Sequence, residues 1–171
     1  MTMAQSGRRA FQVLLFLVPM GILQHCWYWQ RLPDSVAVHF GPGGQADNWM
    51  PRLQAVLVQA SFQVVFPFVM LLLGQLTYVL PVSMINIPWR EYWLQPDRRS
   101  DSLAWMSSML SWISVGMSLL ILLLSHLTFQ ANMTQQPLQM VPFFCLLGVF
   151  MTFVFSMVLL CFRRFHRPPA L

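Results

Sequence analysis

Charged residues are scarce in this sequence, and lysine is absent from it. Only 9% of the 171 residues are charged, against roughly 25% in soluble domains, while 57% are hydrophobic. A water-soluble chain of this length could not bury so much apolar surface, because a small domain must leave much of its surface facing water. The composition therefore excludes a soluble fold and indicates an integral membrane protein.

The sequence also lacks recognisable motifs for metal binding, redox chemistry or catalysis. The three cysteines form no Cys-x-x-Cys pair, the histidines form no His-x-x-x-His pair, and no apolar run carries an acidic residue or an arginine near its middle. The arginines stand in small groups rather than along one polar face, which argues against a nucleic-acid-binding surface. We therefore expect no catalytic residues, no cofactor or metal, and no nucleic-acid partner.

Four apolar runs are long enough to cross a bilayer core of about 30 Å, which takes roughly 20 helical residues. They cover residues 10–29, 53–84, 103–129 and 140–162, and the second is longer than one span requires. No small-x-small cleavage site follows the first run, so we expect it to be retained rather than removed as a signal peptide. The predicted fold class is an all-α integral membrane protein with four transmembrane helices.

The distribution of arginine predicts the orientation of these helices. The first loop has two arginines balanced by two aspartates, and the third loop has no charge, whereas the N-terminus, the second loop and the tail are rich in arginine. The arginines of these three segments are Arg8, Arg9, Arg90, Arg98, Arg99, Arg163, Arg164 and Arg167. Cytoplasmic loops carry the excess of basic residues, so both termini are predicted to lie in the cytoplasm and loops one and three outside.

Small polar residues recur along the third and fourth runs. In the third run they alternate steps of three and four and form a seam that includes Ser107, Ser111, Ser114 and Ser118. In the fourth run they recur every fourth residue, at Gly148, Thr152 and Ser156. Small residues let membrane helices approach closely, so we predict that these two faces pack together. Dimerisation through the seam, giving a homo-oligomer, is an equal alternative.

The first loop has the pattern of a small ordered cap. Residues 35–40 alternate as a short strand does, and Gly41-Pro42-Gly43-Gly44 is a tight reversal in which glycine supplies positive φ. Pro51 then suits the first turn of the second helix. The imidazole of His39 is expected to hold the cap closed by bonding the reversal or Asp47, or else to contact an external partner.

The same loop carries the motif Leu-Pro-Asp-x-Val-x-x-His-Phe followed by Gly-x-x-Asp-x-Trp. It resembles the bacterial membrane domain of unknown function found at the N-terminus of SdpI-type immunity proteins. The candidate recognition or structural residues on this motif are Pro33, Asp34, His39, Phe40, Gly44, Asp47 and Trp49. The resemblance implies a multi-pass protein of the bacterial cytoplasmic (inner) membrane. SdpI-type members protect a cell from a secreted toxin and act as its receptor.

These observations divide one membrane domain, residues 1–171, into three parts. A helix–loop–helix unit at 10–84 carries the motif, an amphipathic cytoplasmic loop follows at 85–103, and a helical hairpin occupies 103–162. The expected function is that of a non-enzymatic sensor or immunity-type protein that recognises an extracytoplasmic peptide or envelope component. Its partners would be the lipid bilayer and a peptide or another membrane protein. The alternative is an accessory subunit of a larger membrane complex, or a small transporter.

Three histidines, His25, His39 and His126, fall on the outer side in this orientation. Converging imidazoles would suit zinc or copper, but these spacings match no metal motif. A polar residue at the membrane interface is the simpler interpretation. Whether the three side chains meet is a question for the structure.

Overall fold

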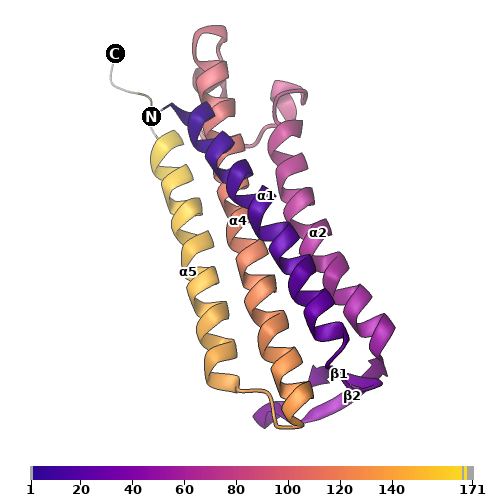
Figure 1. Ribbon diagram of the computed structural model, residues 1–171. Coiled ribbons are helices and arrows are strands. Elements are labelled where there is room, and N and C mark those ends of the chain that lie inside the picture. The colour runs from indigo at the N-terminus through magenta and orange to yellow at the C-terminus, as the bar shows by residue number, and fades with distance from the viewer. Residues whose placement is uncertain (1, 167, 169–171) are drawn as a thin grey trace.

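The four apolar runs form four long helices in the computed structural model, which describes residues 2–166 and 168 (Figure 1). The helices are α1 (Met3–Trp29), α2 (Arg52–Leu76), α4 (Pro96–Thr134) and α5 (Met140–Phe165). Each is long and apolar enough to cross a membrane, as the sequence predicts, and the chain fits a multi-pass membrane protein. Arg167, which we counted in the basic tail, lies outside the described residues.

Two helix boundaries differ from the sequence prediction. Helix α2 ends at Leu76 rather than near residue 84, and a single 3₁₀ turn, η2 (Val82–Met84), follows. Pro81 precedes that turn, and proline both lacks an N–H and disfavours helix in the residue before it, so the helix cannot continue to residue 84. Helix α4 begins at Pro96 instead of 103, because proline is well suited to the first position of a helix.

The predicted cytoplasmic loop is therefore shorter than 85–103. It contains a one-turn helix, α3 (Arg90–Trp93), and its last residues already belong to α4. Helix α4 has 39 residues and spans about 58 Å at 1.5 Å per residue, so part of it extends beyond a hydrocarbon layer of about 30 Å. Trp93 is buried in this linker, and its indole N–H donates to the carbonyl of Phe165 at 3.1 Å.

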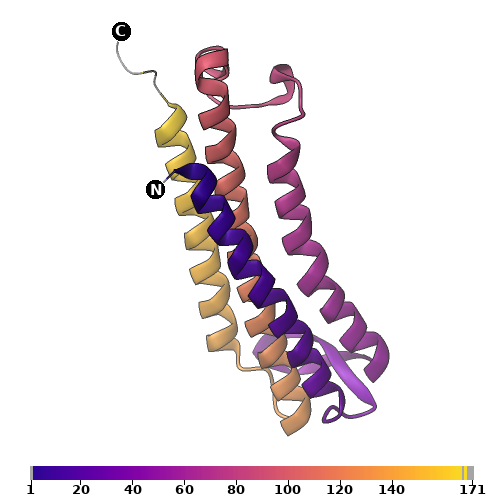
Figure 2. The same cartoon turned by 45° about the horizontal axis from the view of Figure 1, so that its top comes forward.

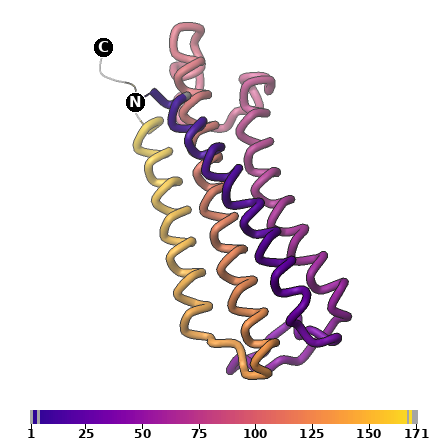
Figure 3. The backbone as a smooth tube through the Cα atoms, in the orientation of Figure 1, coloured from indigo at the N-terminus to yellow at the C-terminus, as the bar shows by residue number. Residues whose placement is uncertain are grey.

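Helix α4 is the centre of the bundle. It packs against α1, α2 and α5, while α5 lies at the edge and packs chiefly on α4 (Figures 1 and 3). The beginning of α1 and the end of α5 lie at one end of the bundle, and a β-hairpin closes the other end (Figure 2). The hairpin therefore lies at the opposite end of the bundle from the first residues of α1 and the last residues of α5.

The serine seam of α4 is buried in the bundle, but its partner is α2 rather than α5. Ser107, Ser111, Ser114 and Ser118 are at most 6% exposed. The Ser114 hydroxyl donates to the carbonyl of Pro67 at 2.7 Å, and Ser118 accepts from the Gln63 amide at 2.8 Å. Serine is small enough to bring α2 close, and these hydroxyls find polar partners there.

The predicted role of the second face, in α5, is wrong. Gly148, Thr152 and Ser156 are exposed, and a Cβ added at Gly148 would meet nothing within 4 Å. The hydroxyls of Thr152 and Ser156 donate to carbonyls one turn earlier in their own helix. Helix α5 instead places the ring of Phe153 against Gly116 of α4. A spacing of small residues permits close approach but does not select the face that is used.

The serine face of α4 and the Gly148 face of α5 should differ in how much a bulky substitution destabilises the protein. Ser114→Leu is expected to destabilise the protein by about 1–3 kcal/mol, because leucine overfills a fully buried position. Gly148→Leu is the matched control on the exposed face and should leave the unfolding temperature in detergent unchanged. Equal destabilisation by both, measured by thermal unfolding, would contradict a buried α4 face and an exposed α5 face. A change of oligomeric state in Gly148→Leu alone would identify a self-association face.

Candidate functional site

The loop between α1 and α2 folds as a β-hairpin. Strand β1 (Ser35–Phe40) has the predicted bounds, and it pairs antiparallel with β2 (Ala46–Pro51), which the sequence analysis did not identify. The reversal between them contains the 3₁₀ turn η1 (Pro42–Gly44), where Gly43 and Gly44 have φ of 83° and 79°. Asp47 and Asn48 disfavour strand on propensity alone, so β2 depends on pairing with β1.

An apolar cluster attaches the hairpin to the bundle. Its buried members come from α1, the loop, β1, α2 and α4: Tyr28, Leu32, Val36, Ala55, Val56 and Phe129. Val36 is fully buried there, which stabilises the attachment by about 1.5–3 kcal/mol relative to an exposed side chain. The cluster fixes one face of the hairpin against the ends of three helices.

Arg52 closes the base of the hairpin at the start of α2. Its guanidinium donates to the carbonyl of Leu32 at 2.9 Å and to the carboxylate of Asp34 at 2.7 Å. Its backbone N–H donates to the carbonyl of Asp34 at 2.8 Å. The Asp34 side chain is 95% exposed, so the ion pair itself contributes at most about 1 kcal/mol.

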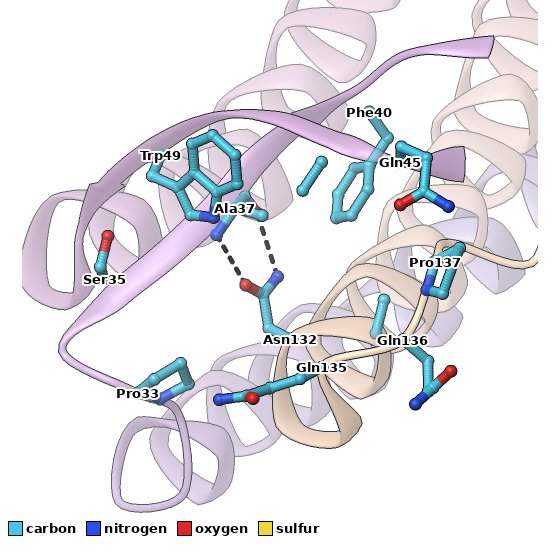
Figure 4. Close-up of a pocket in the computed structure, with 12 residues that line it drawn as sticks. Pro33, Ser35, Ala37, Phe40, Gln45, Trp49, Asn132, Gln135, Gln136 and Pro137 are labelled. Carbon is cyan, nitrogen blue, oxygen red and sulfur yellow. Dashed lines mark hydrogen bonds between the residues drawn. The ribbon is translucent and has the colours of Figure 1, made fainter. Parts of the chain in front are cut away.

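The second half of the chain holds the other side of the hairpin (Figure 4). The Asn132 amide accepts from the N–H of Ala37 at 2.6 Å and donates to its carbonyl at 3.0 Å. The same amide donates to the carbonyl of Thr128 within α4 at 2.8 Å. The N–H of Leu138, in the loop between α4 and α5, donates to the carbonyl of Gly44 at 2.8 Å. The hairpin is thus a fixed cap.

A cavity of about 500 Å³ lies between the cap and the end of α4 (Figure 4). Its polar walls come from Gln45, Asn132, Gln135 and Gln136, and its aromatic walls from Phe40 and Trp49. None of the twelve described residues that line it has an ionisable side chain. The volume is within the range of small-ligand pockets, and the chemistry suits an uncharged group that needs both apolar contact and amide hydrogen bonds.

His39 and Asp47 lie outside this cavity. The two side chains meet across the strands, with the imidazole Nδ1 2.5 Å from a carboxylate oxygen, and both are more than half exposed. The sequence predicted that His39 would bond either the glycine-rich reversal or Asp47, and in the structure its partner is Asp47. This pair ties β1 to β2 on the solvent side.

The motif residues divide into two groups in space. Three line the cavity, namely Pro33, Phe40 and Trp49. The other four hold the hairpin together or onto the bundle, namely Asp34, His39, Gly44 and Asp47. Sequence reasoning missed the contribution of the α4–α5 segment. The sequence shows there an uncharged loop rich in amide side chains. That feature does not predict a contact with the hairpin, because the hairpin is far away along the chain.

The three histidines that the arginine distribution assigns to the outer side do not meet. His25 is buried in α1, with its Nδ1 2.6 Å from the carbonyl of Gly21. His126 bonds the Tyr28 hydroxyl at 2.8 Å, and His39 pairs with Asp47. Within residues 2–166 and 168, no group of three His, Cys, Asp or Glu side chains could hold a metal ion.

Comparison with known proteins gives one match. No curated protein and no solved structure matches this chain. Residues 14–71 match the family model described as a domain of unknown function (DUF1648). The match covers most of α1, the whole hairpin and most of α2, and it leaves α4 and α5 outside. The unit that carries the cap is therefore similar to DUF1648, within a chain whose helices fit a multi-pass membrane protein.

Proposed function

We propose that this protein is a non-enzymatic sensor or immunity-type protein of the bacterial inner membrane, which binds an uncharged segment of an extracytoplasmic peptide in the cavity under its cap. The observation that carries the proposal is the composition of that cavity. Trp49 and Phe40 offer apolar faces, and the amides of Gln45, Gln135 and Gln136 offer donors and acceptors that suit a peptide backbone.

The placement of the cavity supports recognition rather than chemistry. No lining side chain could act as a general acid or base, and binding sites carried on a rigid scaffold commonly lie in its loops. The resemblance of the loop motif to SdpI-type immunity proteins points to a peptide toxin as the class of ligand. Both walls of the cavity are held by hydrogen bonds, so a ligand would meet a preformed site.

A photocrosslinking experiment tests this proposal. A photoreactive amino acid replaces Trp49, which is 53% exposed in the cavity wall, and the matched control carries it at Trp89, which is 61% exposed at the other end. In native membranes, the proposal predicts a discrete peptide or protein adduct at position 49 that position 89 does not form. Intramolecular adducts alone at position 49 would refute recognition in this cavity.

The orientation is a separate prediction. The arginine distribution places the hairpin outside the cytoplasm and α3 inside. In a variant without Cys26, Cys145 and Cys161, a single cysteine at Asn48 should react with a membrane-impermeant maleimide added to intact cells. A single cysteine at Glu91 should react only after the membrane is opened. Both positions are exposed, so the reverse result would invert the topology and reject the extracytoplasmic site.

The exposed face of α5 supports a second candidate, an accessory subunit of a larger membrane complex. Helix α5 packs chiefly on α4, and Gly148, Thr152 and Ser156 stand on its exposed side, where a partner helix could approach closely. Co-purification from mild detergent should then recover a defined partner, and Gly148→Leu should release it. Recovery of an isolated monomer in both cases would reject this candidate.

A further inference from the structure

Within residues 2–166 and 168, three buried side-chain atoms have no hydrogen-bond partner: Oε1 of Gln24, Nε2 of His25 and Oε1 of Gln63. All three belong to α1 or α2, inside the apolar bundle. Buried polar groups in membrane proteins are normally satisfied, because hydrocarbon offers no replacement for water. Among the described residues, the protein itself supplies no donor to these three atoms.

The amide of Gln63 is fully buried, and its orientation is determined by its neighbours. Its nitrogen is 2.8 Å from the hydroxyl of Ser118 and 3.4 Å from the carbonyl of Leu17. A carbonyl only accepts, so the nitrogen must face Leu17 and the oxygen is left as the free atom. The carbon chain of Gln63 lies over Gly21, where an added Cβ would come within 2.5 Å.

The imidazole of His25 is 2% exposed and contacts the same glycine. Its Nδ1 lies 2.6 Å from the carbonyl of Gly21, so Nδ1 is the donor and, in a neutral ring, Nε2 is an acceptor. The ring packs perpendicular to that of Phe129 of α4, with ring centroids 5.3 Å apart. Gly21 thus contacts both residues: its carbonyl bonds the imidazole of His25, and its Cα faces the side chain of Gln63. Each of these side chains has a buried acceptor without a donor.

We propose that water enters between α1, α2 and α4 beside Gly21 and donates hydrogen bonds to Oε1 of Gln63 and Nε2 of His25. Both atoms are buried, so water reaches them only when the helices part. Water suits both atoms, because each is an acceptor and a water molecule is a small donor.

Helices α1 and α2 each contain a proline near Gly21 and Gln63, where the helix can bend. Pro19 lies two residues before Gly21, and Pro67 lies one turn after Gln63. Proline has no N–H, so the carbonyls of Leu15 and Gln63 lack their usual helical donors. Helices bend most readily at such positions. The unsatisfied acceptors favour the entry of water between the helices. The nearby prolines make the bending that admits it easier.

Thiol accessibility tests this directly. In a variant without native cysteines, Ser118→Cys places a thiol on the fully buried partner of Gln63. A small charged thiosulfonate reagent reacts only with thiols that water reaches, so we expect measurable modification in native membranes. Adding Gln63→Leu removes an acceptor and should slow the reaction at least tenfold. The matched control, Ser102→Cys at the other end of α4, should react at a rate that Gln63→Leu does not change.

An inert Ser118→Cys, under conditions where the denatured chain reacts, would overturn the proposal, and so would equal rates with and without Gln63→Leu. Hydroxyl-radical labelling of the unsubstituted protein gives a second test that needs no variant. Phe129, beside His25, and Phe165, at the other end, are both fully buried. We expect Phe129 to be oxidised several-fold faster, and equal slow oxidation of the two rings would equally overturn the proposal.

Discussion

Replacing Gly44 with alanine is expected to detach the β-hairpin from the α4–α5 loop and to lower the free energy of unfolding by about 2–5 kcal/mol. Two causes act together. Gly44 has a φ of 79°, which a residue with a Cβ adopts only under strain. The added Cβ would also lie 2.1 Å from the carbonyl oxygen of Leu138, a backbone atom that cannot rotate away.

Gly43 provides the matched control for this variant. Its φ of 83° is nearly the same, but an added Cβ would meet nothing within 4 Å. Gly43→Ala should therefore cost only the backbone strain, about 1–2 kcal/mol. Thermal unfolding in detergent, followed by tryptophan fluorescence, should separate the two variants. If Gly44→Ala and Gly43→Ala unfold at the same temperature, the contact between the hairpin and Leu138 does not stabilise the protein.

The second large effect is expected at Asn132. Asn132→Leu removes both bonds to Ala37 and leaves its N–H and carbonyl without partners beside a leucine side chain. Each buried group left unsatisfied costs about 1–3 kcal/mol, so we expect a loss of about 2–5 kcal/mol. The corresponding fall in unfolding temperature is roughly 5–15 °C for a chain of this size.

Asn48→Leu is the control for Asn132→Leu, because Asn48 is an exposed asparagine of the same hairpin. A surface substitution there should change stability by no more than about 0.5 kcal/mol. The proposed ligand site gives a second readout. Asn132 lines the cavity, so crosslinking from position 49 should fall in Asn132→Leu and persist in Asn48→Leu. Unaltered stability and crosslinking in Asn132→Leu would mean that the amide does not position the cap.

The sequence predicted the elements of the cap better than its attachments. The alternation of residues 35–40 and the glycines after them predicted β1 and the reversal, because both signals are local. The partner strand β2 was missed, since Asp47 and Asn48 are poor strand formers and only pairing makes them extended. Asn132 is 95 residues from Ala37, and no local pattern connects the two.

The helix faces show a similar limit. The period of the α4 serines correctly indicated a packing seam, but the same reasoning assigned Gly148 and its neighbours to the wrong side of α5. Small residues lower the cost of close approach for any partner. Which partner comes close depends on how the surfaces of all four helices fit together. A spacing in one helix contains none of that information.

Apolar run length and composition by themselves determined four helices long and apolar enough to cross a membrane, because crossing hydrocarbon requires each helix to be apolar and to satisfy its own backbone. The glycines and alternating residues of the first loop likewise determined its reversal and first strand. Only the tertiary structure decided that the α4–α5 loop completes the cap, that α4 is the central helix, and that Gln63 of α2 packs against Gly21 of α1. These arrangements join residues far apart in the chain, and their stability depends on how all the surfaces fit at once.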